Sequence, residues 1–244
     1  MDTWALSCRS VLVFAARVGC AVPSSQVQHS PHPDAAGFVL AGGKSTRMGR
    51  DKALLTLCGQ PLIAHALSIL RAAGLSASIA GAHPDLSQFA PVVADAEPNR
   101  GPLAGVCAAL ASTTARFNVL LSVDTPFVPS SLLAYLLCHA RMTGHAVTVS
   151  SLAGFPQTFP AVIDRIIQPH LQAELRAGRN GCFAAFQAAS AGICHSASLV
   201  PVEYLAQSGQ ATDVDALPSN FWFLNLNSPA DARRADELSR RRIA

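Results

Sequence analysis

The sequence lacks the surplus of positive charge that marks most nucleic-acid-binding proteins. Its 18 Lys and Arg residues are nearly balanced by 15 Asp and Glu residues, which leaves a formal net charge of +3 over 244 residues. The basic residues are also scattered along the chain. Without a basic patch, the chain has little electrostatic attraction for a phosphate backbone. We therefore expect no nucleic acid among its partners.

Paired cysteines are also lacking. The seven cysteines form no C-x-x-C pair and no zinc-like spacing with the eight histidines. Structural zinc sites and disulfide frameworks usually show such spacings. An odd number of widely spaced cysteines is typical of reduced thiols in a cytosolic protein. We therefore predict a cytoplasmic protein and assign no cysteine a catalytic role.

Long apolar runs are scarce, which argues against a membrane-spanning segment. The run Val11–Cys20 could suggest a signal peptide, but Arg17 interrupts it, and a spanning helix needs roughly 20 apolar residues. Proline and small polar residues follow up to Pro33, a composition typical of flexible segments. We interpret residues 1–35 as a disordered N-terminal extension and residues 36–244 as a single domain, and we expect no membrane partner.

Strand and helix signals alternate from about Ala36 onward, which predicts βαβ units. Half of the residues are hydrophobic, as suits helices packed on both faces of a sheet. The expected strands are residues 38–41, 78–80, 92–94, 118–123, 146–150, 157–163 and 221–226. The expected helices are residues 61–73, 103–111, 130–141, 165–176, 181–189 and 229–241. The sequence therefore predicts the α/β class with a mainly parallel sheet.

Two expectations for the C-terminal third rest on proline. Pro160 cannot donate a ladder hydrogen bond, so residues 157–163 are expected at an edge of the sheet. Residues 196–219 contain prolines and small polar residues, and we expect a loop with one short strand there.

The most informative segment is residues 37–52, which read GFVLAGGKSTRMGRDK. The apolar start predicts a strand. Gly42 and Gly43 carry no side chain, so successive N–H groups can turn into one concavity that holds an anion. Arg47 and Lys52 add positive charge, and a guanidinium can bind two phosphate oxygens at once. The segment therefore predicts a phosphate-binding loop.

Two better-known phosphate loops are excluded by spacing. A Walker A loop that places its last glycine at Gly43 needs another glycine five positions earlier, where the chain has Phe38. A dinucleotide-binding fingerprint needs G-x-G-x-x-G, and neither Gly42 nor Gly43 begins one. The loop is therefore neither of these motifs.

The loop does match the signature L-A-G-G-x-S-x-R-M-G-x-D-K of the Rossmann-like nucleotidyltransferases at every fixed position. Within that superfamily, the chain resembles the molybdenum cofactor guanylyltransferases of the MobA family, because further matches follow in the same order. These matches are Asp95, residues 101–105 (GPLAG), residues 124–127 (DTPF) and residues 225–229 (NLNSP). The resemblance covers about residues 36–240.

The resemblance implies a Rossmann-like three-layer α/β/α nucleotidyltransferase fold and an enzyme that uses Mg²⁺. Such an enzyme transfers GMP from GTP to molybdenum-molybdopterin, releases pyrophosphate and forms the molybdopterin guanine dinucleotide cofactor. Molybdenum-insertion proteins and molybdoenzyme chaperones are the further partners that the resemblance implies.

The resemblance also implies roles at the matching positions. The residues expected to bind the nucleotide are Leu40, Ala41, Gly42, Gly43, Lys52, Asp95 and Asp124. The residues expected to be catalytic are Arg47 at the β- and γ-phosphates, Lys52 at the α-phosphate, and Asp124. Asp95 would accept hydrogen bonds from guanine. Gly81 stands where family members often have Asn, so this position offers no side-chain contact to the base or ribose.

The expected metal ligands follow from their places in the predicted fold. Ligands of open α/β sheets bind at the carboxyl ends of the strands, and Gly42, Asp95, Asp124 and Asn227 all follow expected strands. Mg²⁺ prefers oxygen ligands and few protein contacts. We therefore predict Asp124 as a metal ligand, with Asn227 as a second group from the last strand.

The sequence leaves alternatives open for the residues that bind the pterin acceptor, for the base of the nucleotide and for the class of protein. An anionic pterin acceptor needs basic partners, for which Arg100, Arg176 and Arg179 are candidates. A cytidylyltransferase usually shows L-A-A-G in the loop and D-Q-P in the turn, unlike this chain. A sugar-phosphate nucleotidyltransferase usually has a longer chain. A nucleotide sensor without enzymatic activity would not need both Lys52 and Asp124.

Overall fold

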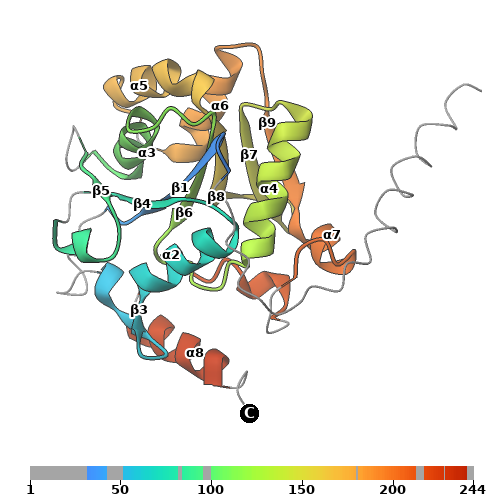
Figure 1. Cartoon of the computed structure of the whole chain (residues 1–244). Coiled ribbons are helices and arrows are strands. Elements are labelled where there is room, and N and C mark those ends of the chain that lie inside the picture. Colours follow the sequence, from blue (N-terminus) through green and yellow to red (C-terminus); the bar gives the residue numbers. More distant parts are fainter. Residues whose placement is uncertain are drawn as a thin grey trace, which may run out of the picture. The chain divides into compact units, whose positions relative to one another are not determined.

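The computed structural model describes residues 32–42, 52–81, 84–95, 100–179, 181–212, 217–227 and 229–240. Within this part of the chain, seven strands form one sheet with the order β5-β4-β1-β6-β8-β7-β9 (Figure 1). The strands are β1 (Ala35–Leu40), β4 (Ala77–Ala80), β5 (Val92–Val93), β6 (Phe117–Ser122), β7 (Val147–Leu152), β8 (Phe155–Asp164) and β9 (Ala197–Pro201).

Most neighbouring strands run in the same direction. β5, β4, β1 and β6 pair in parallel, and so do β7 and β9. β8 runs antiparallel to both β6 and β7. The predicted α/β class with a mainly parallel sheet is therefore confirmed.

Helices cover both faces of the sheet, which gives the three layers of the predicted fold (Figure 1). The α-helices are α2 (Leu62–Ala72), α3 (Pro102–Ala111), α4 (Ser130–Thr143), α5 (Gln168–Arg176), α6 (Cys182–Ala191), α7 (Val202–Gln207) and α8 (Pro229–Arg240). Short 3₁₀ helices are η1 (Lys52–Leu54), η2 (Pro84–Gln88), η3 (Arg165–Ile167) and η4 (Ser219–Phe221). Buried residues of α2, α4 and α7 form one core, and those of α3, α5 and α6 form a second.

Strand β1 shows how the sequence builds this arrangement. All six of its residues are buried, and its side chains alternate between the two cores. Val39 packs in the core of α2 and α4, whereas Phe38 and Leu40 pack in the core of α3 and α6. Such a continuous apolar strand is typical of a parallel sheet covered on both faces. It places the residues that follow Leu40 at the carboxyl edge of the sheet.

The prediction that residues 157–163 form an edge strand is wrong. They belong to β8, which lies between β6 and β7. The ladder with β7 shifts register between Val149 and Ser150, and Pro160 falls in the resulting bulge. On the other side, the pairing with β6 ends at Ala161. Proline fits inside the sheet here because a bulge leaves its position out of the ladder.

The C-terminal third differs from the prediction in two more places. Residues 221–226 form no strand, because their apolar side chains fill a core instead: the chain passes through η4 and a turn, and Trp222, Phe223 and Leu226 are buried. Residues 196–219 contain the expected short strand, β9, but also helix α7, which was not predicted.

Two features near the N-terminus were also not predicted. Strands β2 (Thr56–Leu57) and β3 (Gln60–Pro61) form a hairpin whose turn residues Cys58 and Gly59 both have positive φ angles, of 50° and 77°, as a tight hairpin turn requires. Asp34 forms an ion pair with Arg141 of α4, and β1 begins at Ala35. Asp34 and Ala35, which were assigned to the extension, therefore contact the described domain. Residues 1–31 lie outside the described residues, and the predicted extension stays a prediction there.

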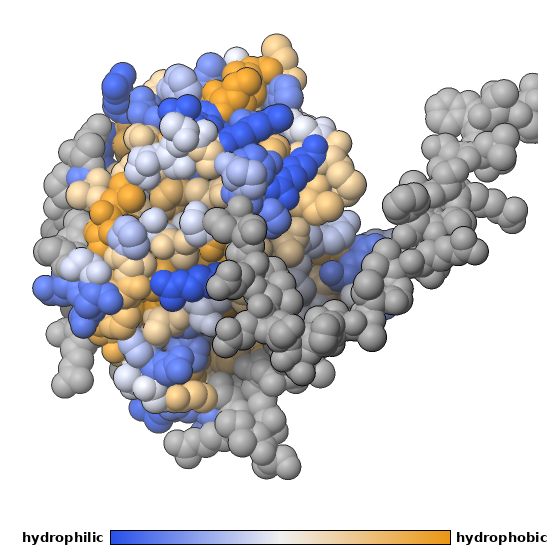
Figure 2. Space-filling view, viewed as in Figure 1, coloured by the Kyte–Doolittle hydropathy of each residue, from blue (hydrophilic) through white to orange (hydrophobic). Residues whose placement is uncertain are grey.

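The surface mixes polar and apolar groups. Figure 2 shows hydrophilic and hydrophobic residues interspersed in small groups on the face it presents. The large exposed apolar side chains of the described residues lie on separate elements, among them Met142 on α4, Phe155 on β8 and Tyr204 on α7. Scattered exposure of this kind is ordinary. No described helix is both long and apolar enough to span a bilayer.

Candidate active site

The ends of four parallel strands bring the predicted binding residues to one edge of the sheet. Leu40 at the end of β1 is in register with Ser122 of β6 and with Ala80 of β4. The backbone N–H of Val123 donates to the Leu40 oxygen over 3.2 Å, and that of Ala41 donates to the Ala80 oxygen over 3.0 Å. These bonds continue the sheet by one residue beyond the strands. Gly42 therefore leaves the sheet beside Asp124 on one side and Gly81 on the other.

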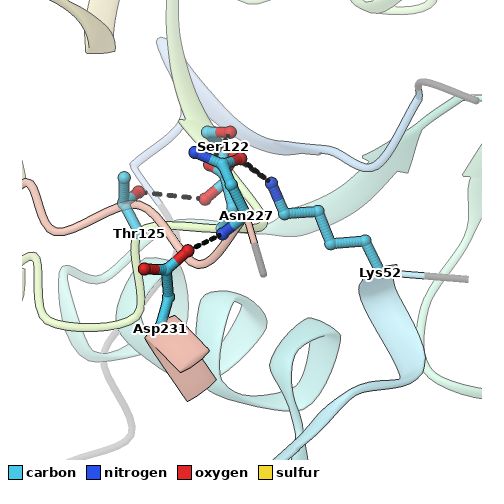
Figure 3. A network of polar contacts seen from close by, with 6 residues as sticks. Lys52, Ser122, Thr125, Asn227 and Asp231 are labelled. Carbon is cyan, nitrogen blue, oxygen red and sulfur yellow. Dashed lines mark hydrogen bonds and ion pairs between the residues drawn. The ribbon is translucent and has the colours of Figure 1, made fainter. Parts of the chain in front are cut away.

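Lys52 connects two segments that are distant in the sequence (Figure 3). Its Nζ lies 2.6 Å from Asp124 Oδ2, after β6, and 2.6 Å from Asn227 Oδ1, before α8. The side chains of Lys52 and Asp124 are only 21% and 18% exposed. Partial burial strengthens such an ion pair because water screens it less. The structure therefore brings three of the predicted site residues together as one polar cluster.

The carboxylate of Asp124 is fixed by its own turn. Ser122 donates from Oγ to Asp124 Oδ1, and Thr125 donates from Oγ1 to the Ser122 backbone oxygen over 3.1 Å. In Figure 3, Lys52 extends toward this cluster from the side opposite Thr125. A carboxylate that is hydrogen-bonded from behind can present its other oxygen in one direction. Ser122 and Thr125 thus position the oxygen that Lys52 contacts.

Asn227 is held from its backbone. Its N–H donates to Asp231 Oδ2 over 3.0 Å, and Asp231 lies in the first turn of α8. The preceding residue, Leu226, is buried and donates from its N–H to the Asp124 backbone oxygen over 3.0 Å. Asn227 is therefore positioned by the bond between Leu226 and Asp124 and by its contact with the first turn of α8. The prediction that Asn227 follows a strand is wrong.

Asp95 lies beside Gly42 and Gly105. Its Oδ2 is 3.9 Å from the point where a Cβ on Gly42 would stand, and its Oδ1 is 3.6 Å from the corresponding point on Gly105. Oδ1 is buried and has no hydrogen-bond partner among the described residues. Burial raises the pKa of the Asp95 carboxyl above its ordinary value. This oxygen is therefore suited to accept a hydrogen bond from a ligand.

Gly81 allows these strand ends to approach closely. Its φ angle is +144°, and a Cβ at this position would lie 2.8 Å from the backbone nitrogen of Gly42. Both the angle and the contact require glycine. The absence of an Asn at this position, noted from the sequence, therefore has a structural cause in this chain: the backbone of Ala41 and Gly42 occupies the space.

Comparison with known proteins agrees with this geometry. Residues 37–191 match the MobA-like NTP transferase domain. The chain belongs to this family. The predicted resemblance is thereby confirmed.

Relatives and solved structures extend the match beyond that domain. A molybdenum cofactor guanylyltransferase of Rhodobacter capsulatus is 33% identical over 84% of this chain and 96% of its own length. Another, of Xanthomonas euvesicatoria, is 40% identical over 43% of this chain, and that match spans about half, 54%, of the relative. The crystal structure of molybdopterin-guanine dinucleotide biosynthesis protein A from Archaeoglobus fulgidus has a TM-score of 0.68 at 21% identity, covering 84% of this chain and 99% of that one. At this identity the likeness shows the fold alone.

The arginines predicted to face an acceptor in this MobA-like chain gather at the C-terminal end of α5. Arg100 donates from Nη2 to the Leu175 backbone oxygen, and Arg179 binds both carboxylate oxygens of Glu174. Arg176 is the last residue of α5 and is exposed. The structure thus brings the three together, although Arg100 and Arg179 already have partners within the chain. Their role toward an acceptor stays a prediction.

Two predicted site residues, Gly43 and Arg47, lie outside the described residues, and their roles stay predictions. Conversely, sequence reasoning missed the supporting residues Ser122, Thr125 and Asp231. A signal existed for Asp231, because proline followed by an acidic residue marks the first turn of a helix. For Ser122, two residues before the predicted ligand Asp124, no sequence pattern distinguishes a supporting hydroxyl from an ordinary strand serine.

Proposed function

We propose that this chain transfers GMP from GTP to molybdenum-molybdopterin and releases pyrophosphate, which forms the molybdopterin guanine dinucleotide cofactor. The observation that carries the proposal is the contact of the Lys52 ammonium with Asp124 and Asn227, at the edge of the sheet where β1 and β6 end. Family membership and the near full-length match to the Rhodobacter capsulatus enzyme support it. Because GTP is a cytoplasmic metabolite, we place the reaction in the cytoplasm.

The reaction requires two anions to meet. An oxygen of the terminal phosphate of molybdopterin attacks the α-phosphorus of GTP, the bond from that phosphorus to the bridging oxygen breaks, and pyrophosphate leaves with the bond's electrons. Little covalent help is needed, so positioning and charge stabilisation supply the catalysis. Lys52 provides a positive charge from a partly buried position, and we assign it to the α-phosphate. Its charge matters most while negative charge develops there.

The oxygens of Asp124 and Asn227 fit a magnesium ion. Both already hold a cationic group, the Lys52 ammonium, at 2.6 Å. A carboxylate and an amide oxygen are hard donors, and Mg²⁺ takes few protein ligands and keeps several waters. The described residues contain no group of three or more His, Cys, Asp or Glu side chains that could hold a metal ion, so an ion at this site would rest on few protein ligands. A bound magnesium ion would add positive charge against the phosphates of the nucleotide.

The nucleotide itself is assigned to the strand ends around Gly42 and Asp95. We propose that the backbone of Leu40, Ala41 and Gly42 contacts it, and that Asp95 accepts from the N1–H and N2 amino groups of guanine. The buried Oδ1 of Asp95, which has no partner among the described residues, supports this assignment. A ligand donor would satisfy that oxygen, whereas cytosine has no matching pair of donors.

Turnover with different nucleotides tests the proposal. The purified chain is incubated with molybdenum-molybdopterin, MgCl₂ and GTP, CTP or UTP, and pyrophosphate and the pterin dinucleotide are both measured. We expect product with GTP and little with the pyrimidine nucleotides. Product with CTP in place of GTP would show that the chain uses cytosine rather than guanine as the base. Absence of pyrophosphate release with every nucleotide would contradict an enzymatic role. Asp85→Asn, an exposed carboxylate on η2, serves as a control for Asp124→Asn.

A further inference from the structure

Lys52 occupies the same two oxygens that are proposed to hold the metal ion. Its Nζ contacts Asp124 Oδ2 and Asn227 Oδ1 at 2.6 Å each. The second carboxylate oxygen of Asp124 accepts from Ser122, and the amide of Asn227 has one oxygen. The oxygens that face the centre of the cluster are therefore all in contact with the ammonium.

An ammonium and a divalent ion cannot share these oxygens. Mg²⁺ binds oxygen ligands at about 2.0–2.1 Å, which would place it beside the ammonium, and two cations at such a separation repel each other strongly in a partly buried site. The side chain of Lys52 is flexible, since four carbons separate its charge from the backbone. Lys52 can therefore leave the oxygens, provided that its charge finds another partner.

We propose that Lys52 is the resident cation of the metal site, and that binding of a nucleotide triphosphate exchanges it for the divalent ion. The proposal rests on the proposed function only in taking Asp124 and Asn227 as metal ligands. In this exchange the triphosphate accepts the Lys52 ammonium, which frees the two oxygens for the ion. The same lysine thereby stabilises the site between turnovers and reaches the α-phosphate during one.

The exchange couples the two ligands. A metal ion that binds alone must break the contacts of Lys52 with Asp124 and Asn227 and brings no anion in return, so its affinity is low. A triphosphate that removes Lys52 raises that affinity, and by thermodynamic linkage the metal raises the affinity for the triphosphate by the same factor. A nucleoside without phosphates cannot accept the lysine, so it should not change metal affinity.

Binding of Mn²⁺ alone tests the exchange without any turnover. Titration calorimetry or electron paramagnetic resonance compares wild type, Lys52→Met and Arg71→Gln; Arg71 is an exposed cation on α2. We expect Lys52→Met to bind Mn²⁺ about tenfold more tightly than wild type, within the usual range of site coupling, and Arg71→Gln to match wild type. Adding Asp124→Asn to Lys52→Met should remove the gain. Equal or weaker Mn²⁺ binding by Lys52→Met would overturn the proposal.

A second measurement observes the wild-type chain, so its result does not depend on whether a variant folds. The sequence contains two lysines, Lys44 and Lys52, so isotope-labelled lysine gives two side-chain NMR signals, which Lys52→Arg assigns. We expect the Lys52 signal to keep its position with guanosine and to shift when MgCl₂ and a non-hydrolysable GTP analogue bind together. An unshifted Lys52 signal in the nucleotide complex would overturn the exchange.

The outcomes separate this inference from the proposed function. If molybdopterin receives no GMP but Lys52→Met gains Mn²⁺ affinity, the proposed reaction is wrong and the exchange stands. If GMP transfer occurs and Lys52→Met shows no gain, the reaction stands and the exchange is wrong.

Discussion

The backbone N–H of Leu226 donates a hydrogen bond of 3.0 Å to the backbone oxygen of Asp124. This bond joins the segment before α8 to the turn after β6, and it brings Asn227 to the side chain of Lys52. Leu226 is itself buried in the core of α2 and α4. The polar cluster is therefore anchored by apolar packing on one side and by a backbone bond on the other.

Loss of the Asp124 charge should stop metal-dependent turnover. Asp124→Asn keeps the size of the side chain but removes the charge that faces Lys52. We expect kcat to fall at least about 100-fold, the scale observed when a charge-stabilising group is removed, while circular dichroism shows an intact fold. Asp85→Asn is expected to leave kcat unchanged. A near-normal rate for Asp124→Asn at saturating MgCl₂ would contradict the ligand assignment.

Loss of the Lys52 charge should affect kcat more than the KM for GTP. In the proposed mechanism the ammonium matters most when charge develops on the transferred phosphate, so its removal raises the barrier more than it weakens the ground-state complex. Steady-state kinetics of Lys52→Met should therefore show kcat reduced about 100-fold or more. If only KM changed, Lys52 would have a role in substrate binding alone.

Asp95 should select guanine through its N2 amino group. ITP lacks that group, so wild type should prefer GTP over ITP by about tenfold in kcat/KM, the worth of one hydrogen bond to a charged acceptor. In Asp95→Asn this preference should fall to near one. Measuring both nucleotides with both proteins checks the assignment, and an unchanged preference in the variant would place the base elsewhere.

The Asp95 carboxyl should also make stability depend on pH. Burial raises its pKa above the ordinary value of 3.8, so the folded state disfavours the charged form. Its contribution to stability is therefore fully present below the unfolded pKa and is lost as pH rises through the folded pKa. Asp95→Asn should gain unfolding free energy over wild type at neutral pH, and the gain should shrink as pH falls toward 3.8. Urea titrations across this range test it, with Asp85→Asn as the control for a lost carboxylate.

A side chain at Gly81 should displace the backbone of Gly42. Gly81→Ala places a Cβ 2.8 Å from Gly42 N at a φ of +144°, so we expect about 2 kcal/mol or more of destabilisation together with a raised KM for GTP. Gly209→Ala provides the control: its φ is +69° with open space around the added Cβ, so it should cost about 1 kcal/mol and leave KM unchanged. Equal KM values for GTP in both variants would show that the Gly81 position does not affect nucleotide binding.

The first part of the fold could be predicted because a strand such as β1 (AAGFVL) is a continuous apolar run that glycine soon follows. Both ends of helix α2 could also be predicted from the sequence, since Pro61 precedes the helix and Gly74, with a φ of +77°, follows it. The failures share one cause, which is tertiary context. Pro160 is tolerated by a bulge, and residues 221–226 use their apolar side chains for a core rather than for a strand.

The candidate site was predictable where a single residue carries the chemistry. The resemblance to the family singled out Asp95, Asp124 and Lys52, and the structure brings Lys52 and Asp124 into contact. The contact of Lys52 with Asn227 could not be predicted, because it spans 175 positions and depends on how the chain folds after η4. The supporting hydroxyl of Ser122 is likewise visible only through its contact with Asp124.

Transfer of label from GTP to the pterin tests the central claim most directly. GTP labelled at the α-phosphate is incubated with molybdenum-molybdopterin, MgCl₂ and the chain, and the labelled products are separated. The account predicts that label enters the pterin dinucleotide in step with pyrophosphate release, and that Lys52→Met and Asp124→Asn each slow both processes about 100-fold or more. Label that remains in GTP, or that appears only as free GMP, would contradict it.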